Sequence, residues 1–142
     1  MKIIGTGSAL PEQIVTNEDL TKFLDTSDEW IVSHTGIRER RVLDRESVND
    51  IGTLAARRAL EDAGLALEEL DLLICSNVAS DYFTPGPACF IAGALGFSGQ
   101  TLDMNGACTG FLQALDIADA YLRAGKARNV LIVAAEKPSY LA

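Results

Sequence analysis

One cysteine of this chain lies in a sequence that favours nucleophilic chemistry. Cys108 stands within Asp103–Phe111, where an apolar segment passes through small residues into a segment of helical periodicity. The first amide groups of a helix have no partner inside the helix, and with the helix dipole they favour a thiolate and a developing oxyanion. Gly106 and Gly110 leave room for a substrate beside the sulfur. Cys108 is therefore a candidate nucleophile for acyl transfer.

The alternative for a free cysteine is that it serves as a small buried hydrophobic residue. Cys75 lies in an apolar run and Cys89 in a predicted helix, so this alternative holds for both. The sequence around Cys108 favours the nucleophile. His34, the single histidine, is a candidate base for Cys108, and the competing interpretation is a solvated residue at a helix C-terminus.

Two aromatic positions are candidates for ligand or partner contacts. Trp30, the single tryptophan, lies among polar residues of a short predicted helix, so a ligand or the protein itself is expected to cover one face of its ring. Tyr82 and Phe83 lie in the predicted loop Asp81–Pro85, which either packs on the protein or forms a pocket wall or partner surface. Both interpretations stay open for each position.

A basic cluster interrupts an acidic chain. It consists of Arg38, Arg40 and Arg41, and the nearby Glu39 and Asp44 predict a solvated ion-pair face rather than a phosphate site. The whole sequence carries 12 Lys and Arg against 20 Asp and Glu, a net charge of -8. This balance argues against nucleic acid and anionic membranes as partners.

Length and composition predict a folded protein of one-domain size. The 142 residues are 48% hydrophobic and 23% charged, as is typical of packed globular proteins. No apolar run approaches the roughly 20 residues of a membrane-spanning helix, and the N-terminus lacks the apolar stretch of a secretory signal. The three cysteines form no Cys-x-x-Cys pair and indicate neither disulfides nor a metal site. We therefore expect a cytoplasmic protein without metal or resident cofactor.

Strands and helices alternate in the predicted fold. Strands are expected at Lys2–Ser8, Leu72–Cys75, Thr101–Met104 and Val130–Ala135. Helices are expected to begin at capping boxes opened by Thr16, Thr26 and Ser47, and to end at Gly64, Gly96 and Gly125. Strands separated by helices usually pair in parallel. The prediction is a layered α/β domain with a mostly parallel mixed sheet and covering helices.

The long helices have predicted inward faces. These are Ile51, Leu54, Ala55 and Ala59 in the first, and Phe111, Leu112, Leu115, Ala118 and Leu122 in the second. A shorter helix is expected at Pro87–Leu95. Beyond the last predicted strand, Glu136–Ala142 contains no further strand or helix, which suggests that the chain is a fragment of a larger fold.

Several motifs, in this order, resemble the β-ketoacyl-ACP synthase III enzymes, which have the thiolase fold and start fatty acid synthesis. They are Ile4–Ser8 with Leu10–Pro11, Thr16–Asn17, Asp25–Ile31, Thr35–Arg40 and Ala107–Phe111. The resemblance covers the whole chain, residues 1–142, but only the N-terminal half of a family member. It implies a thiolase-like half domain of an acyltransferase, a homodimer in the complete enzyme, and a missing C-terminal half.

By this resemblance Cys108 accepts an acyl group from acyl-CoA, which is a substrate, before a decarboxylative condensation with malonyl-ACP. The histidine and asparagine that complete the family's triad belong to the missing half, so the chain by itself is expected to be inactive. Two alternatives are kept. One is a non-catalytic domain that binds acyl-CoA or a partner, and the other is a thiolase-fold condensing enzyme of polyketide or quinolone type.

The resemblance also implies the residues that contact the substrate. Thr26, Trp30 and His34 would bind CoA, with the Trp30 ring stacked on the adenine and His34 where relatives often have an arginine. Phe83 and Thr84 would line the acyl pocket across the dimer interface, and Thr84 would leave more room than the bulkier residue of members that take short primers.

Overall fold

The computed structural model of the chain describes residues 1–137. They form two compact units, one of residues 10–46 and the other of residues 1–9 together with the chain from Ser47 onwards. The sequence predicts one half domain over residues 1–142. Both units lie within that range, and their grouping into one half domain remains a prediction. The sequence also predicts no further strand or helix in Glu136–Ala142. From position 138 onwards, this prediction falls outside the described residues.

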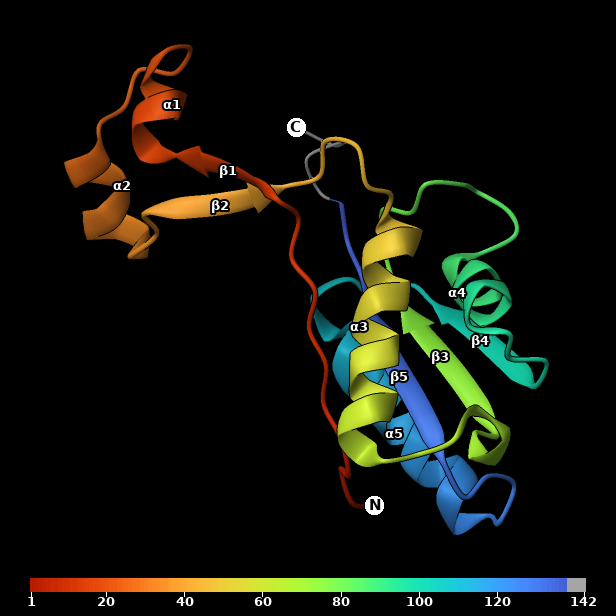
Figure 1. Ribbon diagram of the computed structural model, residues 1–142. Helices are drawn as coiled ribbons and strands as arrows, with labels where there is room; N and C mark the ends of the chain where they lie inside the picture. Colours follow the sequence, from red (N-terminus) through yellow and green to blue (C-terminus); the bar gives the residue numbers. More distant parts are fainter. Residues whose placement is uncertain (138–142) are drawn as a thin grey trace. The chain divides into compact units, whose positions relative to one another are not determined.

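A parallel three-stranded sheet forms the centre of the larger unit, as predicted. β3 (Leu72–Ser76) lies between β4 (Gln100–Met104) and β5 (Val130–Ala134), and all five of its residues are buried (Figure 1). Leu72 pairs with Gln100 on one side and with Val130 on the other. The apolar run of β3 matches this central position, because a strand covered on both faces has no polar side.

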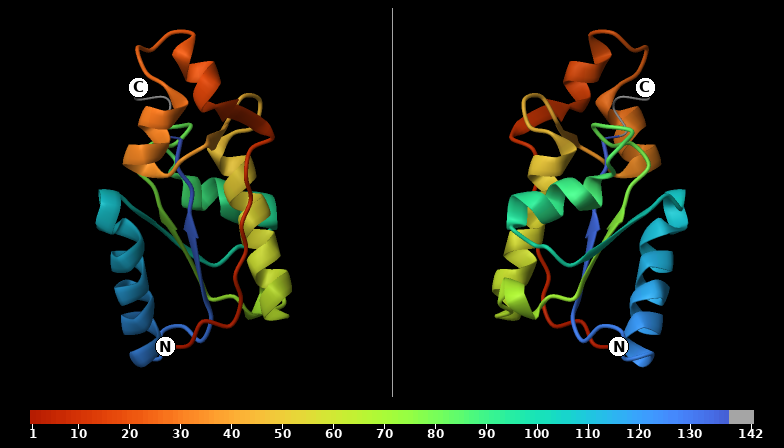
Figure 2. Two further views of the ribbon diagram at one scale, coloured as in Figure 1. Left: turned by 90° about the vertical axis from the view of Figure 1, so that its left-hand side faces the viewer. Right: turned by 90° about the vertical axis from the view of Figure 1, so that its right-hand side faces the viewer.

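Three helices cover the two faces of this sheet. α3 (Val48–Ala63) and α4 (Pro87–Leu95) lie on one face, and α5 (Gly110–Arg123) lies on the other (Figure 2). Short 3-10 helices precede β3 and α5, η1 at Leu67–Glu69 and η2 at Ala107–Thr109. Helices on both faces of a parallel sheet are the layered α/β architecture that the sequence predicts.

The inward face of α5 agrees with the predicted one at Ala118 and differs from it at Leu112. Ala114 and Ala118 are its buried apolar side chains, and they pack with Leu72 and Ile74 of β3. The predicted inward residue Leu112 is 67% exposed. Small alanines occupy this face because the helix lies close to the strand, and larger side chains are displaced to its flanks.

The buried face of α3 also differs from the predicted one, whereas the helix begins and ends where the sequence predicts. Val48, Gly52 and Ala56 are buried, whereas the predicted Leu54 is 41% exposed. Gly52 allows close packing of α3, because a Cβ there would lie 3.0 Å from the Ile91 side chain of α4 and 3.3 Å from Ala135. The predicted Ser47 capping box and the left-handed stop at Gly64 are both confirmed.

Residues 2–8 do not form the predicted strand. The segment runs along α3, where Cβ atoms at Gly5 and Gly7 would collide with the helix backbone. Its polar backbone groups bond to side chains of this helix: Thr6 N–H donates to Asp62 at 2.8 Å, and Ser8 C=O accepts from Arg58 at 2.6 Å. Side chains of α3 therefore satisfy groups that a strand would direct to a neighbouring strand.

The smaller unit contains two strands that the sequence analysis missed. β1 (Gln13–Thr16) and β2 (Glu39–Val42) pair antiparallel, and α1 (Asn17–Thr21) and α2 (Asp28–Thr35) lie between them in the chain. The Thr16 capping box of α1 is confirmed. The cap of α2 is Ser27 rather than Thr26, since the Ser27 hydroxyl accepts the Trp30 N–H at 3.1 Å.

The core of this unit is a buried asparagine. Asn17 is 1% exposed, and its amide donates to Asp28 at 2.7 Å and to the Ile37 carbonyl at 2.8 Å. Its carbonyl oxygen accepts from Arg40 at 2.8 Å. Arg40 therefore supports the fold of this unit, and the predicted pairing of the arginines with Glu39 and Asp44 is not what the structure shows. Arg41 likewise donates to backbone carbonyls.

No helix in the described part of the chain is long and apolar enough to cross a membrane.

Candidate functional site

Cys108 lies in a strained turn between β4 and α5. The chain leaves β4 at Met104 and passes through η2 before α5 begins at Gly110. Ala107 has φ +45°, and it is the one non-glycine residue with positive φ in the described part of the chain. Alanine rarely adopts this left-handed conformation, and strained residues of this kind gather at functional sites. The side chain of Cys108 is exposed at this turn.

The two glycines beside the sulfur are required by the protein itself. A Cβ on Gly106 would lie 2.5 Å from the Gln113 side chain and 2.7 Å from the Gly110 Cα atom. A Cβ on Gly110 would overlap with the Ser76 hydroxyl at the end of β3. The sequence analysis attributed these glycines to substrate access, but their first role is to let the turn pack against β3 and α5.

A polar cluster fixes the carboxyl ends of the three strands next to this turn. Asn77 N–H donates to the Met104 carbonyl at 3.0 Å, and its side-chain amide donates to the Ala135 carbonyl. The Glu136 carboxylate accepts from Val78 N–H at 3.0 Å and from Ala79 N–H at 3.3 Å. Since parallel strands end at one edge, this cluster holds the segment after β3 beside the segment that carries Cys108.

The loop between β3 and α4 is fixed at several points and presents Phe83. Asp81 accepts the Asn49 N–H of α3 at 3.1 Å, and the Tyr82 ring stacks on Phe90 of α4 at 4.9 Å between centroids. Phe83 is fully exposed, and Thr84 follows it. The predicted acyl-pocket residues thus lie on a loop that starts from the same sheet edge as the turn of Cys108.

Trp30 and His34 form a stacked pair on α2. Their ring centroids are 4.2 Å apart with an angle of 22° between the ring planes, and Trp30 is 58% exposed. His34 Nδ1 lies 2.7 Å from the Trp30 carbonyl, which can only accept, so Nδ1 carries a proton and donates. The Thr26 hydroxyl is buried and has no hydrogen-bond partner among the described residues. All three predicted CoA contacts belong to the smaller unit.

The other two cysteines have different surroundings. Cys75 is completely buried in β3, and burial, with the negative charges of Asp103 and Glu136, raises the pKa of its thiol to about 12. Cys89 is exposed on α4, with its sulfur 3.6 Å from the Thr101 hydroxyl. The prediction that Cys75 is a buried hydrophobic residue is confirmed, whereas the same prediction for Cys89 is wrong.

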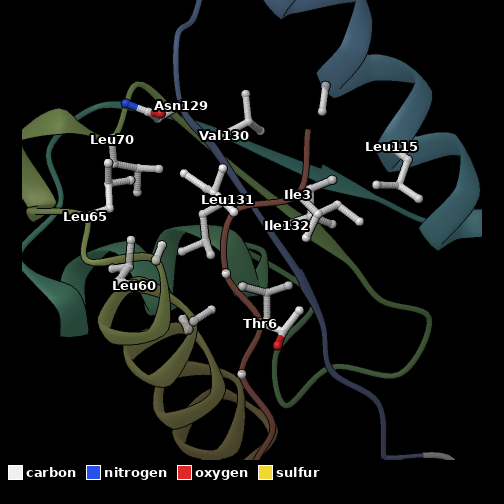
Figure 3. Close-up of a pocket in the computed structure, with 18 of the residues that line it drawn as sticks. Ile3, Thr6, Leu60, Leu65, Leu70, Leu115, Asn129, Val130, Leu131 and Ile132 are labelled. Atoms are coloured by element: carbon white, nitrogen blue, oxygen red, sulfur yellow. The ribbon is translucent and has the colours of Figure 1, made fainter. Parts of the chain in front are cut away.

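The larger unit contains an apolar cavity of about 360 Å³. Ile3 of the N-terminal segment, Leu60 of α3, Leu115 of α5 and Leu131 of β5 contribute to its wall (Figure 3). None of the six predicted site residues lines it. Within residues 1–137, no group of three or more His, Cys, Asp or Glu side chains is placed to hold a metal ion.

The fold and the turn of Cys108 define a thiolase-like α/β protein. A profile of the family 3-oxoacyl-[acyl-carrier-protein (ACP)] synthase III matches residues 102–142. Beta-ketoacyl-[acyl-carrier-protein] synthase III of Aquifex aeolicus is 48% identical over 139 residues, which cover 97% of this chain and 45% of the relative. The chain corresponds to the N-terminal half of these proteins and spans less than half the length of the curated relatives it matches.

Solved structures agree with this assignment. The crystal structure of 3-oxoacyl-[acyl-carrier-protein] synthase III from Aquifex aeolicus VF5 matches with a TM-score of 0.95 and 46% identity, over 98% of this chain and 46% of that one. The priming beta-ketosynthase of the R1128 polyketide biosynthetic pathway matches with a TM-score of 0.91 and 38% identity, over 96% of this chain and 41% of that one.

Proposed function

We propose that this chain is the cysteine-bearing half of a condensing enzyme that transfers an acyl group from acyl-CoA to malonyl-ACP. The observation that carries the proposal is the exposed Cys108 in a strained turn before α5. The relatives support the proposal, because nearly the whole chain aligns with beta-ketoacyl-[acyl-carrier-protein] synthase III at 48% identity.

The first step is acylation of Cys108. Its thiolate attacks the thioester carbonyl, a C–S bond to the protein forms, and the C–S bond to CoA breaks, so that CoA leaves as a thiolate and takes up a proton. The tetrahedral intermediate carries an oxyanion, which by the family resemblance is stabilised by the Cys108 amide together with a glycine amide of the C-terminal half. Thr26, Trp30 and His34 are proposed to bind the CoA, and Phe83 and Thr84 to line the acyl pocket.

The second step is condensation. Loss of carbon dioxide from malonyl-ACP leaves a carbanion, which attacks the acyl-Cys108 carbonyl and releases the sulfur as 3-ketoacyl-ACP forms. This carbanion requires positioned hydrogen-bond donors, and the family resemblance assigns them to a histidine and an asparagine in the C-terminal half. No metal or resident cofactor enters these steps. We propose that the complete enzyme is a homodimer in the cytoplasm, where its three free thiols stay reduced.

Intact-mass spectrometry of the complete natural protein with acetyl-CoA tests the first step. We expect one added acetyl group in the wild type and in Cys89→Ser, and none in Cys108→Ser. An acetyl group that persists in Cys108→Ser would contradict the proposal, and so would an unmodified wild type with acetyl-CoA and longer acyl-CoA alike.

Adding malonyl-ACP tests the second step. We expect the complete protein to release 3-ketoacyl-ACP, and the 142-residue chain by itself to give slow acylation at most and no such product. Each missing electrostatic or acid–base group typically lowers the rate by about 10²- to 10⁴-fold. Product from the chain by itself that disappears in His34→Ala would show that His34 is the base.

A further inference from the structure

We propose that Asp103 is a positioning residue that holds the loop of Phe83 and Thr84 against β4, the strand that leads into the turn of Cys108, and that it thereby sets the acyl-chain preference. The inference rests on the proposed function, because the preference is measured on the acylation of Cys108. Asp103 lies in β4, five positions before Cys108.

The carboxylate of Asp103 takes the place of the missing side-chain cap of α4. The N-cap residue of this helix is Gly86, which has no side chain, and Pro87 at the first helical position has no N–H. The first N–H of the helix is therefore that of Ala88, and it donates to Asp103 Oδ1 at 2.8 Å. A negative group at a helix N-terminus is also favoured by the helix dipole.

The absence of a side chain at Gly86 allows this contact. A Cβ at Gly86 would overlap with the carboxylate of Asp103, so any larger residue must displace it. The close approach means that the end of the loop lies directly on β4. Gly86 follows Thr84 by two positions, so Asp103 fixes the chain just after the predicted pocket residues, as the stacking of Tyr82 on Phe90 fixes it just before them.

The two ends of the loop are thus tied to neighbouring positions of one strand. The loop begins at Asn77, whose N–H donates to the Met104 carbonyl at 3.0 Å, and it ends at Gly86 and Ala88 beside Asp103. Removing the carboxylate removes the contact at the second end, while the contacts of Asp81 and Tyr82 and the β3–β4 pairing remain. The substitution is therefore expected to shift the end of the loop next to Thr84 without displacing the turn of Cys108.

The test compares variants of the complete natural protein by the rates at which acetyl-CoA and octanoyl-CoA acylate Cys108. Asp103→Ala removes the acceptor, whereas Asp103→Asn retains an amide oxygen that accepts from Ala88. Gly86→Ala keeps the carboxylate but pushes it away. Asp116→Ala is the matched control, since Asp116 is exposed on α5. Thermal unfolding and hydrogen exchange of the Ala88 amide are measured on each variant.

We expect Asp103→Ala and Gly86→Ala to change the acetyl-to-octanoyl rate ratio by about threefold or more and to speed exchange at Ala88. In Asp103→Asn and Asp116→Ala, the acetyl-to-octanoyl rate ratio and the exchange rate of the Ala88 amide should stay near the wild-type values. A lower unfolding temperature with an unchanged ratio would overturn the proposal, because Asp103 would then only stabilise the helix. An Asp103→Asn variant as altered as Asp103→Ala would overturn it too. A wild type that is not acylated at Cys108 would instead contradict the proposed function itself.

Discussion

The imidazole of His34 lies face to face with the indole of Trp30, with 4.2 Å between the ring centroids. Because His34 occupies one face of Trp30, a ligand ring has only the other face for stacking. The hydrogen bond from Nδ1 to the Trp30 carbonyl fixes the imidazole in this position. The sequence leaves open whether a ligand or the protein covers the Trp30 ring. The structure shows that His34 covers one of its two faces.

This arrangement predicts how CoA affects the tryptophan signal. We expect CoA to quench Trp30 fluorescence in the complete protein, and Trp30→Ala to weaken CoA binding about tenfold or more, since stacking of a base on an aromatic ring is worth about 1–3 kcal/mol. Calorimetric titration measures the affinity. Unchanged affinity in Trp30→Ala, together with no quenching at millimolar CoA, would remove Trp30 from the site.

The three thiols are predicted to react at different rates with iodoacetamide. Cys108 is exposed in its turn and should be labelled first, while Cys75 should stay unlabelled in folded protein because its thiol is buried and its pKa is about 12. Peptide mass spectrometry over time gives each rate, and Cys108→Ser serves as control. Labelling of Cys75 or Cys89 as fast as Cys108 would count against the nucleophile assignment.

The left-handed conformation of Ala107 predicts effects of different size for two substitutions. Ala107→Gly relieves strain of about 1 kcal/mol but adds flexibility to the unfolded chain, so the free energy of unfolding should change by less than about 1 kcal/mol. Ala107→Val should lower the free energy of unfolding by more than about 1 kcal/mol, because a β-branched residue at positive φ is strongly disfavoured. Urea unfolding measures both. Equal stabilities of the two variants would show that the turn does not impose this conformation.

The capping box of α3 predicts a dependence of stability on pH. Hydrogen bonds from the backbone and hydroxyl of Ser47 lower the pKa of Asp50 below its ordinary value of 3.8. Because the folded-state pKa is the lower one, the stabilisation is complete above pH 3.8 and is lost as the pH falls below it through the folded-state pKa.

We therefore expect Asp50→Asn to be less stable than the wild type at pH 7, and the difference to shrink as the pH falls below 4. Ser47→Ala should lower the free energy of unfolding at pH 7 by about 1 kcal/mol. Denaturant unfolding at several pH values gives these differences. A gap between Asp50→Asn and the wild type that grows on acidification would contradict the assigned sign.

Thr84 is predicted to set the size of the acyl group. Thr84→Phe should favour acetyl-CoA over longer acyl-CoA, because each methylene excluded from an apolar pocket removes about 0.8 kcal/mol of binding free energy. Single-turnover acylation of Cys108 with a series of chain lengths measures the preference. Ala120→Phe, at an exposed position of α5, is a matched control away from the loop, and an unchanged profile in Thr84→Phe would show that the loop does not line the pocket.

Much of the fold follows from local sequence chemistry. Ser47 and Thr16 begin helices because each has an acid three positions on, and Gly64 ends one by adopting positive φ. The apolar run of β3 predicts a strand covered on both faces. The four-residue strands β1 and β2 escaped prediction because they contain few apolar residues, and their pairing depends on Asn17, which joins residues far apart in the sequence.

The site was predictable only where one short segment carries the signal. Cys108 could be singled out from its neighbours, whereas Asn77, Asp103 and Glu136 could not, because each acts on backbone groups of distant segments. Glu136 accepts from Val78, which is 58 positions away, and Asp103 accepts from Ala88, which is 15 positions away. An isolated carboxylate in a sequence gives no indication of such partners.

The central place of β3 has a consequence for synthesis on the ribosome. Leu72–Ser76 leaves the ribosome before either neighbour, since Leu72 pairs with Gln100 and with Val130. At about 5–20 residues per second, the apolar strand waits on the order of seconds for its second partner. At the start of that interval α3 is the one sheet-covering helix already synthesised, and α4, β4 and α5 follow before β5. The edge of β3 that pairs with β5 therefore stays unpaired longest, and chaperone protection of the nascent chain is expected to matter at this edge.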